Sequence, residues 1–469
     1  MYLSESKIQY VFYHLRNHIS EESIDQQNFL VVKEKEINLL STKNKVVFVL
    51  SEKQYPDPVN VFFQEIELPV LFGLNKGWNE IFREDGNGNI IFSQDLLSSV
   101  FYLLSGQQET ETDERDQFGR FPYSRSIQKK LNCVHLPLVN YYFEMILSGL
   151  EAYARKQGKE FRRLRLFDGF GFTLSHDVDR IAFYHPFLVL YRIKQLLGLA
   201  PLNYSKKATV KYFFSGVLFN LNPFRKGDPW WNFQWMINLE KRLGIRSTFF
   251  FLKQENRFDN SLYKFHFKKI RNLIHKLKEE KFEVGLHGTI KSTYELDNLM
   301  QQTEELARIT QERPVGIRQH YLSFKHPDTF KVQQEAGFCY DTTLAFAEHD
   351  GYRNGYCHPF HPYDFENDCM MKIWEIPLVM MEVSVLNYRK AGFSTMQNAV
   401  RHYIAEAKKF GGIFSLLWHN CRLSDHEFSG TMAFYENLLE EIIRQHPEVM
   451  PGDALISKVS YLRDEQGSC

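Results

Sequence analysis

The chain has 469 residues, which predicts two or three domains, and its 43% hydrophobic and 24% charged residues are ordinary for a globular protein. The formal net charge is zero, which argues against a protein that binds nucleic acid by bulk electrostatic attraction. The six cysteines are scattered without a Cys-x-x-Cys pair, so we expect neither a disulfide framework nor a structural zinc site, and a reducing, cytoplasmic location. The N-terminus shows no signal-peptide pattern, and no window of 18 apolar residues predicts a transmembrane segment.

The first part of the chain forms one compositional block. Strands are predicted where β-branched and aromatic residues gather, at 45–50, 61–63, 68–73 and 90–92. A helix is expected over 93–104, followed by an exposed polar loop over 105–116. We therefore expect a smaller N-terminal α+β domain over 1–125, and then a helical connector over 126–164 with its main helix at 137–156.

From residue 165 to about 455 the pattern becomes an alternation of apolar strands and amphipathic helices. Strands are expected at 171–175, 247–252, 282–286, 315–317, 373–377 and 413–418. Helices are expected between them, for example at 265–281, 297–311 and 329–336. Such alternation is typical of parallel strands joined by crossover helices, and the length fits a distorted (β/α) barrel of about seven strands. The region 181–232 is long for one crossover, so we expect an extra helical insertion there.

The first of these strands leads into two aspartates, Asp177 and Asp179. Residues two apart in a strand point the same way, so both carboxylates face one side, while His176 and Val178 turn away. Buried carboxylates are costly unless they are paired, hydrogen-bonded or bound to a metal. Two interpretations follow: a catalytic base beside a metal ligand, or a helix cap beside a turn residue.

Polar residues also follow the other predicted strands. They are His287, Arg318, His320, Tyr321 and His419, and Glu375 lies within the strand expected at 373–377. Because the C-terminal ends of parallel strands meet at one face of a barrel, we expect these side chains to share a site. A lone histidine or arginine after a strand is usually an ordinary loop residue, but their repetition at several strand ends favours a functional site.

These residues resemble the motifs of the polysaccharide deacetylases, the chitooligosaccharide deacetylase-like family of carbohydrate esterases. The segment Thr173-Leu174-Ser175-His176-Asp177-Val178-Asp179 is similar to the family's first motif, and Leu417-Trp418-His419 to its fifth. His287 stands at the first histidine of the second motif, Arg318-Gln319-His320-Tyr321 at the third, and Trp374-Glu375-Ile376-Pro377 weakly at the fourth. The resemblance covers about 165–450, and the N-terminal block resembles an uncharacterised domain that precedes some bacterial members.

The resemblance implies metal-assisted hydrolysis of an N-acetyl or similar amide on a sugar. Asp177 would then be the general base, Asp179 and His287 would be metal ligands, and zinc would be the expected divalent metal. Arg318 would orient the base, and His419 would protonate the leaving amine. An amide needs such help because it is a poor electrophile with a poor leaving group, which a metal and an acid overcome together.

The sequence departs from the family at residue 291. The second motif is usually His-x-x-x-His, but here Lys291 takes the place of the second histidine. A protonated lysine does not bind a metal. Another residue could complete the site, with His320 preferred; Lys291 could replace the charge of the metal; or the chain could be a degenerate deacetylase.

Four residues are expected to contact a carbohydrate substrate: Tyr321, Asp341, Arg353 and Trp374. Aromatic faces can stack on sugar rings, and Asp and Arg can bond hydroxyl groups, although an ordinary aromatic-rich loop would look the same. A second metal at His358, His361 and Asp364 is not expected, because neighbouring prolines prevent a regular helix face.

The resemblance therefore implies a hydrolase that removes an acyl group, in first place N-acetyl, from an amino-sugar or polysaccharide-related substrate. The alternative is a catalytically degenerate protein of the same fold that binds glycans or acts as a scaffold. Neither interpretation calls for a nucleotide-type cofactor or a nucleic-acid partner, and the oligomeric state is not predicted.

Overall fold

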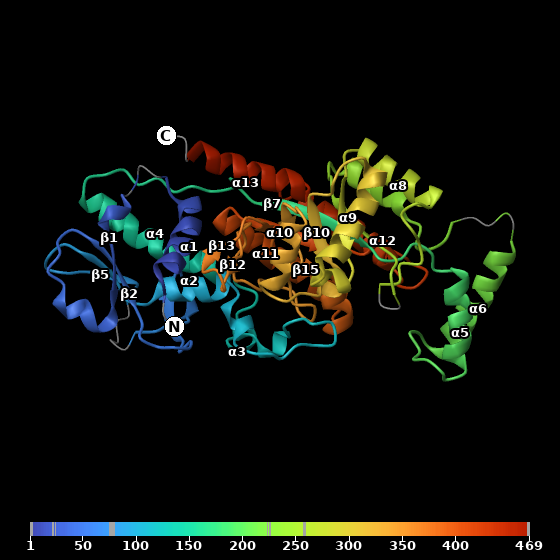
Figure 1. Cartoon of the computed structure of the whole chain (residues 1–469), viewed down its shortest axis with the longest axis horizontal. Helices are drawn as coiled ribbons and strands as arrows, with labels where there is room; N and C mark the ends of the chain where they lie inside the picture. The colour runs from blue at the N-terminus through green and yellow to red at the C-terminus, as the bar shows by residue number, and fades with distance from the viewer. Residues whose placement is uncertain are drawn as a thin grey trace.

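A computed structural model of the chain describes residues 3–20, 23, 25–74, 80–222, 224, 227–256 and 259–466 (Figure 1). The molecule is elongated, with an N-terminal sheet at one end, a large parallel sheet in the middle, and a pair of helices projecting at the other end. Within the described residues, no helix is both long enough and apolar enough to cross a membrane.

The N-terminal block contains a four-stranded mixed sheet and a separate hairpin. The sheet has the order β1-β2-β6-β5, with β1 (Phe29–Lys33), β2 (Val46–Leu50), β6 (Ile90–Phe92) and β5 (Phe82–Glu84). The antiparallel hairpin joins β3 (Val59–Phe63) to β4 (Ile66–Val70). Helices α1 (Glu5–Leu15), α2 (Leu96–Leu104) and α4 (Leu138–Lys156) belong to the same block, with the short α3 (Ile127–Lys130) between the last two. The α+β prediction is confirmed, and the strands expected at 45–50 and 90–92 are β2 and β6.

The polar stretch after α2 is exposed only in its second part, between 110 and 114, whereas its composition predicted an exposed loop throughout. Gln108 and Glu109 are buried, and Glu109 accepts two hydrogen bonds from Arg353 of the barrel, at 2.8 and 2.7 Å. Burial raises the pKa of Glu109, but the Arg353 charge outweighs it and keeps that pKa low. A charge-rich segment is buried here because a bidentate partner, invisible in the local sequence, satisfies it.

The large sheet is parallel and curls around the site. Its order is β14-β11-β10-β9-β8-β7-β16-β15, and β17 (Glu448–Val449) also pairs with β7. The strands are β7 (Gly171–Val178), β8 (Thr248–Leu252), β9 (Glu283–Gly288), β10 (Gly316–Gln319), β11 (Tyr340–Asp341), β14 (Trp374–Glu375), β15 (Met380–Met381) and β16 (Ile413–Leu417). This is the predicted distorted (β/α) barrel, with eight strands on the path instead of about seven.

Helices cover this sheet, as the crossover pattern predicted. They are α7 (Phe233–Arg242), α8 (Lys268–Glu279), α9 (Leu296–Thr310), α10 (Asp328–Glu335), α11 (Phe393–Phe410), α12 (Thr431–Ile443) and α13 (Gly452–Gln466). A small hairpin, β12 (Tyr363–Asp364) with β13 (Cys369–Met370), lies beside the N-terminal helices. One continuous cluster of buried apolar side chains runs from α1 through the barrel strands, so the block and the barrel share a core.

The insertion expected between 181 and 232 is a helical hairpin. Its helices are α5 (Pro186–Leu196) and α6 (Lys206–Leu221), which pack against each other. The hairpin projects beyond α12 at the end of the molecule opposite the N-terminal sheet (Figure 1).

Candidate metal centre and the polar site around it

A cavity of about 550 Å³ opens at the C-terminal edge of the parallel sheet. Of the residues singled out in the sequence, Asp177, Asp179, His320, Tyr321 and His419 line it. The strand β7 runs further than expected, through Val178, so Asp177 lies within the strand and Asp179 directly follows it. Parallel register places the neighbouring residues at the same level, with His287 of β9 opposite Arg318 of β10.

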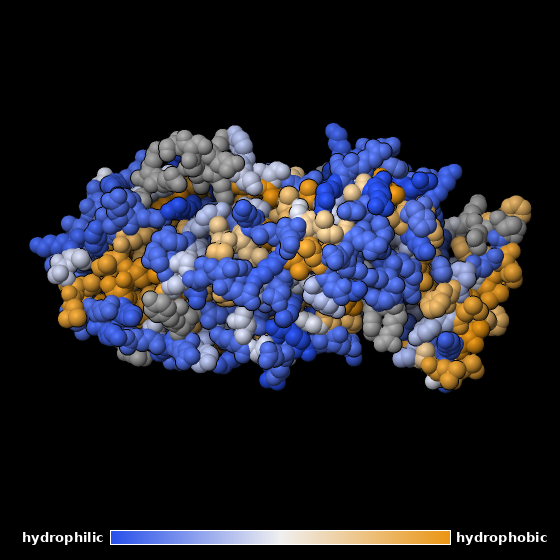
Figure 2. Space-filling view, in the orientation of Figure 1, coloured by the Kyte–Doolittle hydropathy of each residue, from blue (hydrophilic) through white to orange (hydrophobic). Residues whose placement is uncertain are grey.

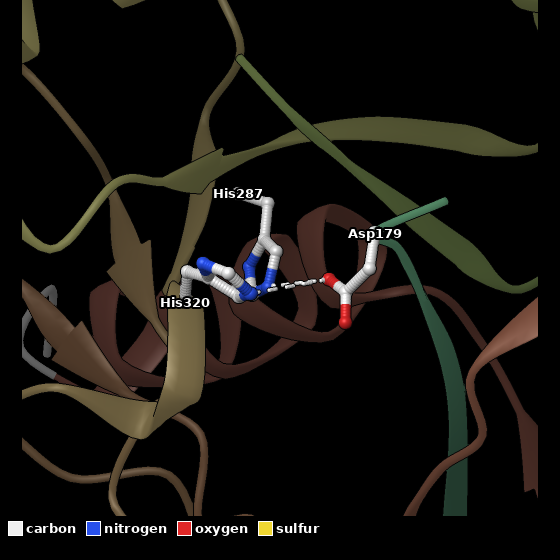
Figure 3. A group of neighbouring side chains, drawn as sticks. All are labelled: Asp179, His287 and His320. Atoms are coloured by element: carbon white, nitrogen blue, oxygen red, sulfur yellow. Dashed lines mark ion pairs between the residues drawn. The ribbon is translucent and has the colours of Figure 1, made fainter. Parts of the chain in front are cut away.

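Asp179, His287 and His320 form a possible metal site (Figure 3). One ligand atom from each lies within 4.8 Å of the others. Asp179 Oδ1 is 3.3 Å from His287 Nε2 and 3.8 Å from His320 Nε2. Asp179 Oδ1 is buried and has no hydrogen-bond donor among the described residues, which is unusual for a carboxylate oxygen. Two imidazoles, one carboxylate and an open cavity fit the donor set of a catalytic zinc site.

The two histidines are held with their Nε2 atoms toward Asp179. His287 Nδ1 lies 2.9 Å from the backbone oxygen of Arg318, and His320 Nδ1 lies 2.9 Å from Asp259 Oδ1. A partner at Nδ1 fixes the ring and leaves Nε2 free, as in most histidine metal ligands. Asp259 is fully buried and lies between β8 and α8, so it supports His320 from a different part of the barrel. Its carboxylate also accepts the backbone N–H of Ile290.

Charges in the site keep the aspartates ionised. Burial raises the pKa of Asp179, but the charges of His320, His419 and His287 outweigh it and lower that pKa strongly. Burial likewise raises the pKa of Asp177, and the charges of His287 and Arg318 reverse the shift. Both groups are therefore carboxylates at neutral pH.

Arg318 fixes one oxygen of Asp177. Its Nη1 donates to Asp177 Oδ1 at 2.9 Å and to Ser175 Oγ at 2.9 Å, and its Nε donates to the backbone oxygen of Thr342. Asp177 Oδ2 instead faces the histidines, at 3.6 Å from His287 Nε2 and 3.9 Å from His419 Nε2. The two oxygens of Asp177 thus have different neighbours, one an arginine and the other the interior of the site.

His419 is oriented by a buried glutamate that the sequence did not reveal. Its Nδ1 lies 2.8 Å from Glu382 Oε1, which leaves Nε2 facing Asp179 and Asp177. Burial lowers the pKa of His419, but Glu382 and the two aspartates outweigh it and raise the pKa to about 9. The imidazole is therefore protonated at neutral pH and can donate a proton.

Lys291 lies outside this site. Its ammonium pairs with Glu295 at 2.9 Å, and its side chain is 48% exposed. The idea that Lys291 replaces the charge of a metal therefore has no support in its position. His176 also turns away, as strand alternation predicted, and contacts the backbone oxygen of Trp418 and the side-chain carboxylate of Glu240.

The four expected substrate residues divide into one at the cavity and three in the interior. Tyr321 lines the cavity, with its ring stacked on Phe118 at 4.3 Å between centroids. Asp341 is buried, accepting hydrogen bonds from Thr343 and Gln333.

Arg353 is hydrogen-bonded to Glu109, and Trp374 packs on the His361 ring. Asp341, Arg353 and Trp374 do not line the cavity, so we do not retain them as substrate contacts. Their polar or aromatic character serves the packing of the barrel instead.

The N-terminal block supplies part of the cavity wall, which the division into domains did not anticipate. Arg120 lines the cavity, pairs with Asp116, and donates to the backbone oxygen of Tyr321 at 2.8 Å. Tyr321 has a positive φ of 60°, a conformation rare for residues other than glycine. The Arg120 bond and the Phe118 stacking hold this strained residue. These residues belong to the segment Asp116-Gln117-Phe118-Gly119-Arg120-Phe121, which nothing in the sequence linked to the barrel.

A sequence-family model described as a family of unknown function, DUF7033, matches residues 2–154. No curated protein matches the chain.

Among solved structures, the chain is similar to a Mycobacterium smegmatis protein named as a polysaccharide deacetylase, with 16% identity and a TM-score of 0.41, covering 63% of this chain and 92% of that one. It is also similar to a probable polysaccharide deacetylase from Pseudomonas aeruginosa PAO1, with 12% identity, a TM-score of 0.39, and coverage of 62% and 91%. A CE4 family pseudoenzyme from Bacillus anthracis matches with 9% identity, a TM-score of 0.32, and coverage of 61% and 66%. The family named from the sequence motifs is thus also named among these structures. At such TM-scores the likeness is loose, and the function proposed below rests on the side chains of the site.

Proposed function

We propose that the chain is a metal-dependent hydrolase that removes an acyl group, in first place N-acetyl, from an amino sugar or a related polysaccharide. The observation that carries the proposal is the meeting of Asp179, His287 and His320 beside Asp177 and His419 at the edge of one cavity. We propose Asp179, His287 and His320 as the ligands and zinc as the metal. A bound divalent metal would polarise the amide carbonyl and lower the pKa of a water molecule.

Asp177 is the proposed base. Arg318 occupies Oδ1, so Oδ2 is the oxygen available to take the proton from the attacking water. Arg318 has its own partners at Ser175 and Thr342, so it holds the carboxylate in one orientation. A base must be positioned and ionised before the reaction, and Asp177 meets both conditions.

His419 is the proposed acid. Glu382 holds its Nδ1, and Nε2 points toward the two aspartates and the cavity. A C–N bond breaks readily only when the nitrogen is protonated, and a histidine with a pKa of about 9 carries that proton at neutral pH. Tyr321 is the proposed substrate contact, since its ring forms part of the cavity wall.

Metal analysis of the purified full-length chain tests this proposal. We expect stoichiometric divalent metal after loading with zinc, and loss of that metal in His320→Ala and His287→Ala. His266→Ala is the matched control, because His266 is exposed and lies away from the cavity residues. Acetate release from N-acetylglucosamine oligomers should follow the metal content.

Three outcomes would contradict the proposal. Absence of bound metal at saturating zinc, cobalt, nickel and manganese would show that these residues do not form a metal-dependent hydrolytic site. Metal retained in His320→Ala would show that the third ligand is another residue. Metal binding without acetate release, together with binding of the same oligomers, would favour the alternative of a degenerate glycan-binding protein.

A further inference from the structure

The α5–α6 hairpin presents an apolar surface that the proposed reaction does not use. On α5 the exposed apolar side chains are Phe187, Leu190 and Ile193, and the exposed Leu197 directly follows the helix. On α6 they are Val210, Phe214, Leu218 and Leu221. Steps of three and four residues place each set along one side of its helix. Figure 2 shows this end of the molecule as a nearly continuous hydrophobic surface.

This surface is not the one by which the two helices pack. Val189 of α5 is buried against α6, where a Cβ added at Gly216 would meet its Cγ2 at 2.5 Å. Tyr212 is buried in a separate aromatic cluster at the base of the hairpin. The hairpin therefore has its own packed internal face, and its exposed leucines and phenylalanines take no part in that packing. Large exposed apolar patches on a protein surface mark interaction sites.

Buried polar contacts hold the base of the hairpin together, and the Tyr212 hydroxyl attaches it to the segment before α12 by donating to the backbone oxygen of His426 at 3.1 Å. The Arg192 guanidinium is buried over the Phe183 ring, 4.3 Å from its centroid, and donates to the backbone oxygens of Phe183 and Tyr212. Asp228 accepts the backbone N–H groups of Phe183 and Tyr184. These specific contacts hold the apolar surface away from the body of the protein, so the rest of the chain does not cover it.

The α5–α6 hairpin itself, from 186 to 227, carries charged residues of one sign. Residues 186–227 include five lysines and two arginines, and no aspartate or glutamate. Lys194, Lys206, Lys207 and Lys211 are exposed beside the apolar stripes. The chain as a whole has equal numbers of basic and acidic residues, so this concentration is local. Exposed leucine and phenylalanine beside lysine, without carboxylates, is the composition of segments that lie in the headgroup region of a bilayer.

We propose that the α5–α6 hairpin docks the protein onto an anionic membrane surface. The apolar side chains would enter the boundary between headgroups and acyl chains, and the lysines would contact lipid phosphates. Neither helix would cross the bilayer, because the 16 residues of α6 span only about 24 Å at 1.5 Å per residue. The uniform positive charge favours an anionic lipid surface over a second copy of the hairpin, since two such surfaces would repel each other.

The hairpin and the cavity share residues. Asn203 and Tyr204, in the link between α5 and α6, line the cavity, and Tyr204 donates to Glu427 on the cavity wall. Docking of the hairpin would therefore hold the cavity close to the bilayer. The docking proposal does not depend on the proposed hydrolysis, and its test uses binding alone.

Flotation of the full-length chain with lipid vesicles tests the docking. We expect the chain to float with vesicles of phosphatidylcholine and phosphatidylglycerol, and to bind vesicles of pure phosphatidylcholine much more weakly. Phe214→Ser with Leu218→Ser should weaken binding by about tenfold or more, because these side chains are 60% and 68% exposed and make the apolar contact. The matched control is Leu39→Ser with Phe62→Ser, at 80% and 70% exposure on the N-terminal block, which should bind as the unaltered chain does.

A second pair of variants tests the charge. Changing three exposed lysines of α6 to glutamine, at Lys206, Lys207 and Lys211, should reduce binding to the anionic vesicles by about tenfold or more. The control removes three exposed lysines elsewhere, at Lys43, Lys130 and Lys372. Added salt should weaken binding of the unaltered chain and have less effect on the charge variant.

The proposal is overturned if the full-length chain does not float with anionic vesicles. It is also overturned if the Phe214 and Leu218 substitutions leave flotation unchanged while the folded state is retained. Sedimentation equilibrium distinguishes docking on lipid from self-association of the chain. A dimer that those substitutions dissociate, in a chain that ignores vesicles, would assign the apolar surface to a second copy of the hairpin.

Discussion

Two groups of buried histidines in this protein lie in opposite electrostatic surroundings. His287, His320 and His419 surround the two aspartates of the site, whereas His14, His18, His358 and His361 lie where the N-terminal block packs on the barrel. In the site, the pKa of His287 is raised, since Asp177 and Asp179 outweigh burial. At the interface, burial lowers the pKa of His18 and of His361 to about 4 each.

The difference lies in the partners. The interface histidines contact neutral groups: His18 Nε2 lies 2.8 Å from the Tyr356 hydroxyl, and the His361 ring packs 3.7 Å from that of Trp374. The site histidines face carboxylates. Burial opposes a charge on imidazole in both places, and only a nearby carboxylate reverses the outcome. A buried histidine therefore indicates a functional site only when anionic neighbours accompany it.

Removing the proposed base should cause the largest loss of activity. Asp177→Asn keeps the shape of the side chain but cannot accept the proton, so we expect acetate release to fall by about a thousandfold. Bound metal should remain, because the three proposed ligands are unchanged. Initial rates of acetate release and metal analysis on the same preparation check this.

Asp168→Asn is the control for that experiment, because Asp168 is exposed and does not line the cavity. Full activity in Asp177→Asn would refute the assignment of the base. Loss of metal in the same variant would instead make Asp177 a ligand.

A smaller effect is expected at the residue that supports His320. Asp259→Ala removes the acceptor 2.9 Å from His320 Nδ1, so the ring loses its fixed orientation. We expect metal affinity to fall by about 10- to 100-fold, as for other residues that orient a metal ligand. Competition with a chromophoric chelator measures this affinity.

Asp259→Asn should retain more of the affinity, because its amide oxygen can still accept the Nδ1–H bond. Equal affinity in the alanine variant and the unaltered chain would show that His320 does not depend on Asp259, and would weaken its place in the metal set.

The smallest expected effect concerns the interface histidines, whose pKa values are shifted in the opposite direction to that of His287 in the site. His18 titrates near 6.5 when unfolded and near 4 when folded, so the unfolded chain gains a proton first as the pH falls. Stability is therefore highest above pH 6.5 and declines toward pH 4. Between pH 7 and pH 5, His18 alone should cost about 2 kcal/mol in the free energy of unfolding.

Urea denaturation at the two pH values measures this loss, which His18→Gln should reduce by about that amount. His266→Gln at the exposed surface is the control and should leave the pH dependence unchanged. An undiminished loss in His18→Gln would show that His18 does not carry the acid sensitivity.

Much of the barrel could be predicted from local pattern. The apolar runs that became β9, β10 and β16 were recognised because buried parallel strands are short, β-branched and followed by polar turns. The roles of buried polar residues were harder to predict from the sequence. Asp341 and Arg353 resembled substrate contacts, but Gln333 and Glu109 satisfy them inside the protein. Their partners lie 8 and 244 positions away, and the long separation in particular leaves no local trace.

The sequence by itself determined that Asp177 and Asp179 share one side of a strand, because alternation is a property of the extended backbone. It also placed His287, Arg318 and His419 near strand ends. Only the tertiary structure decided that His320, and not Lys291, lies beside Asp179 and His287, and that Asp259 and Glu382 orient the histidines. Those relations join different strands, and the register and curvature of the sheet set them. The same holds for the α5–α6 hairpin, whose apolar residues could have been core until the fold left them exposed.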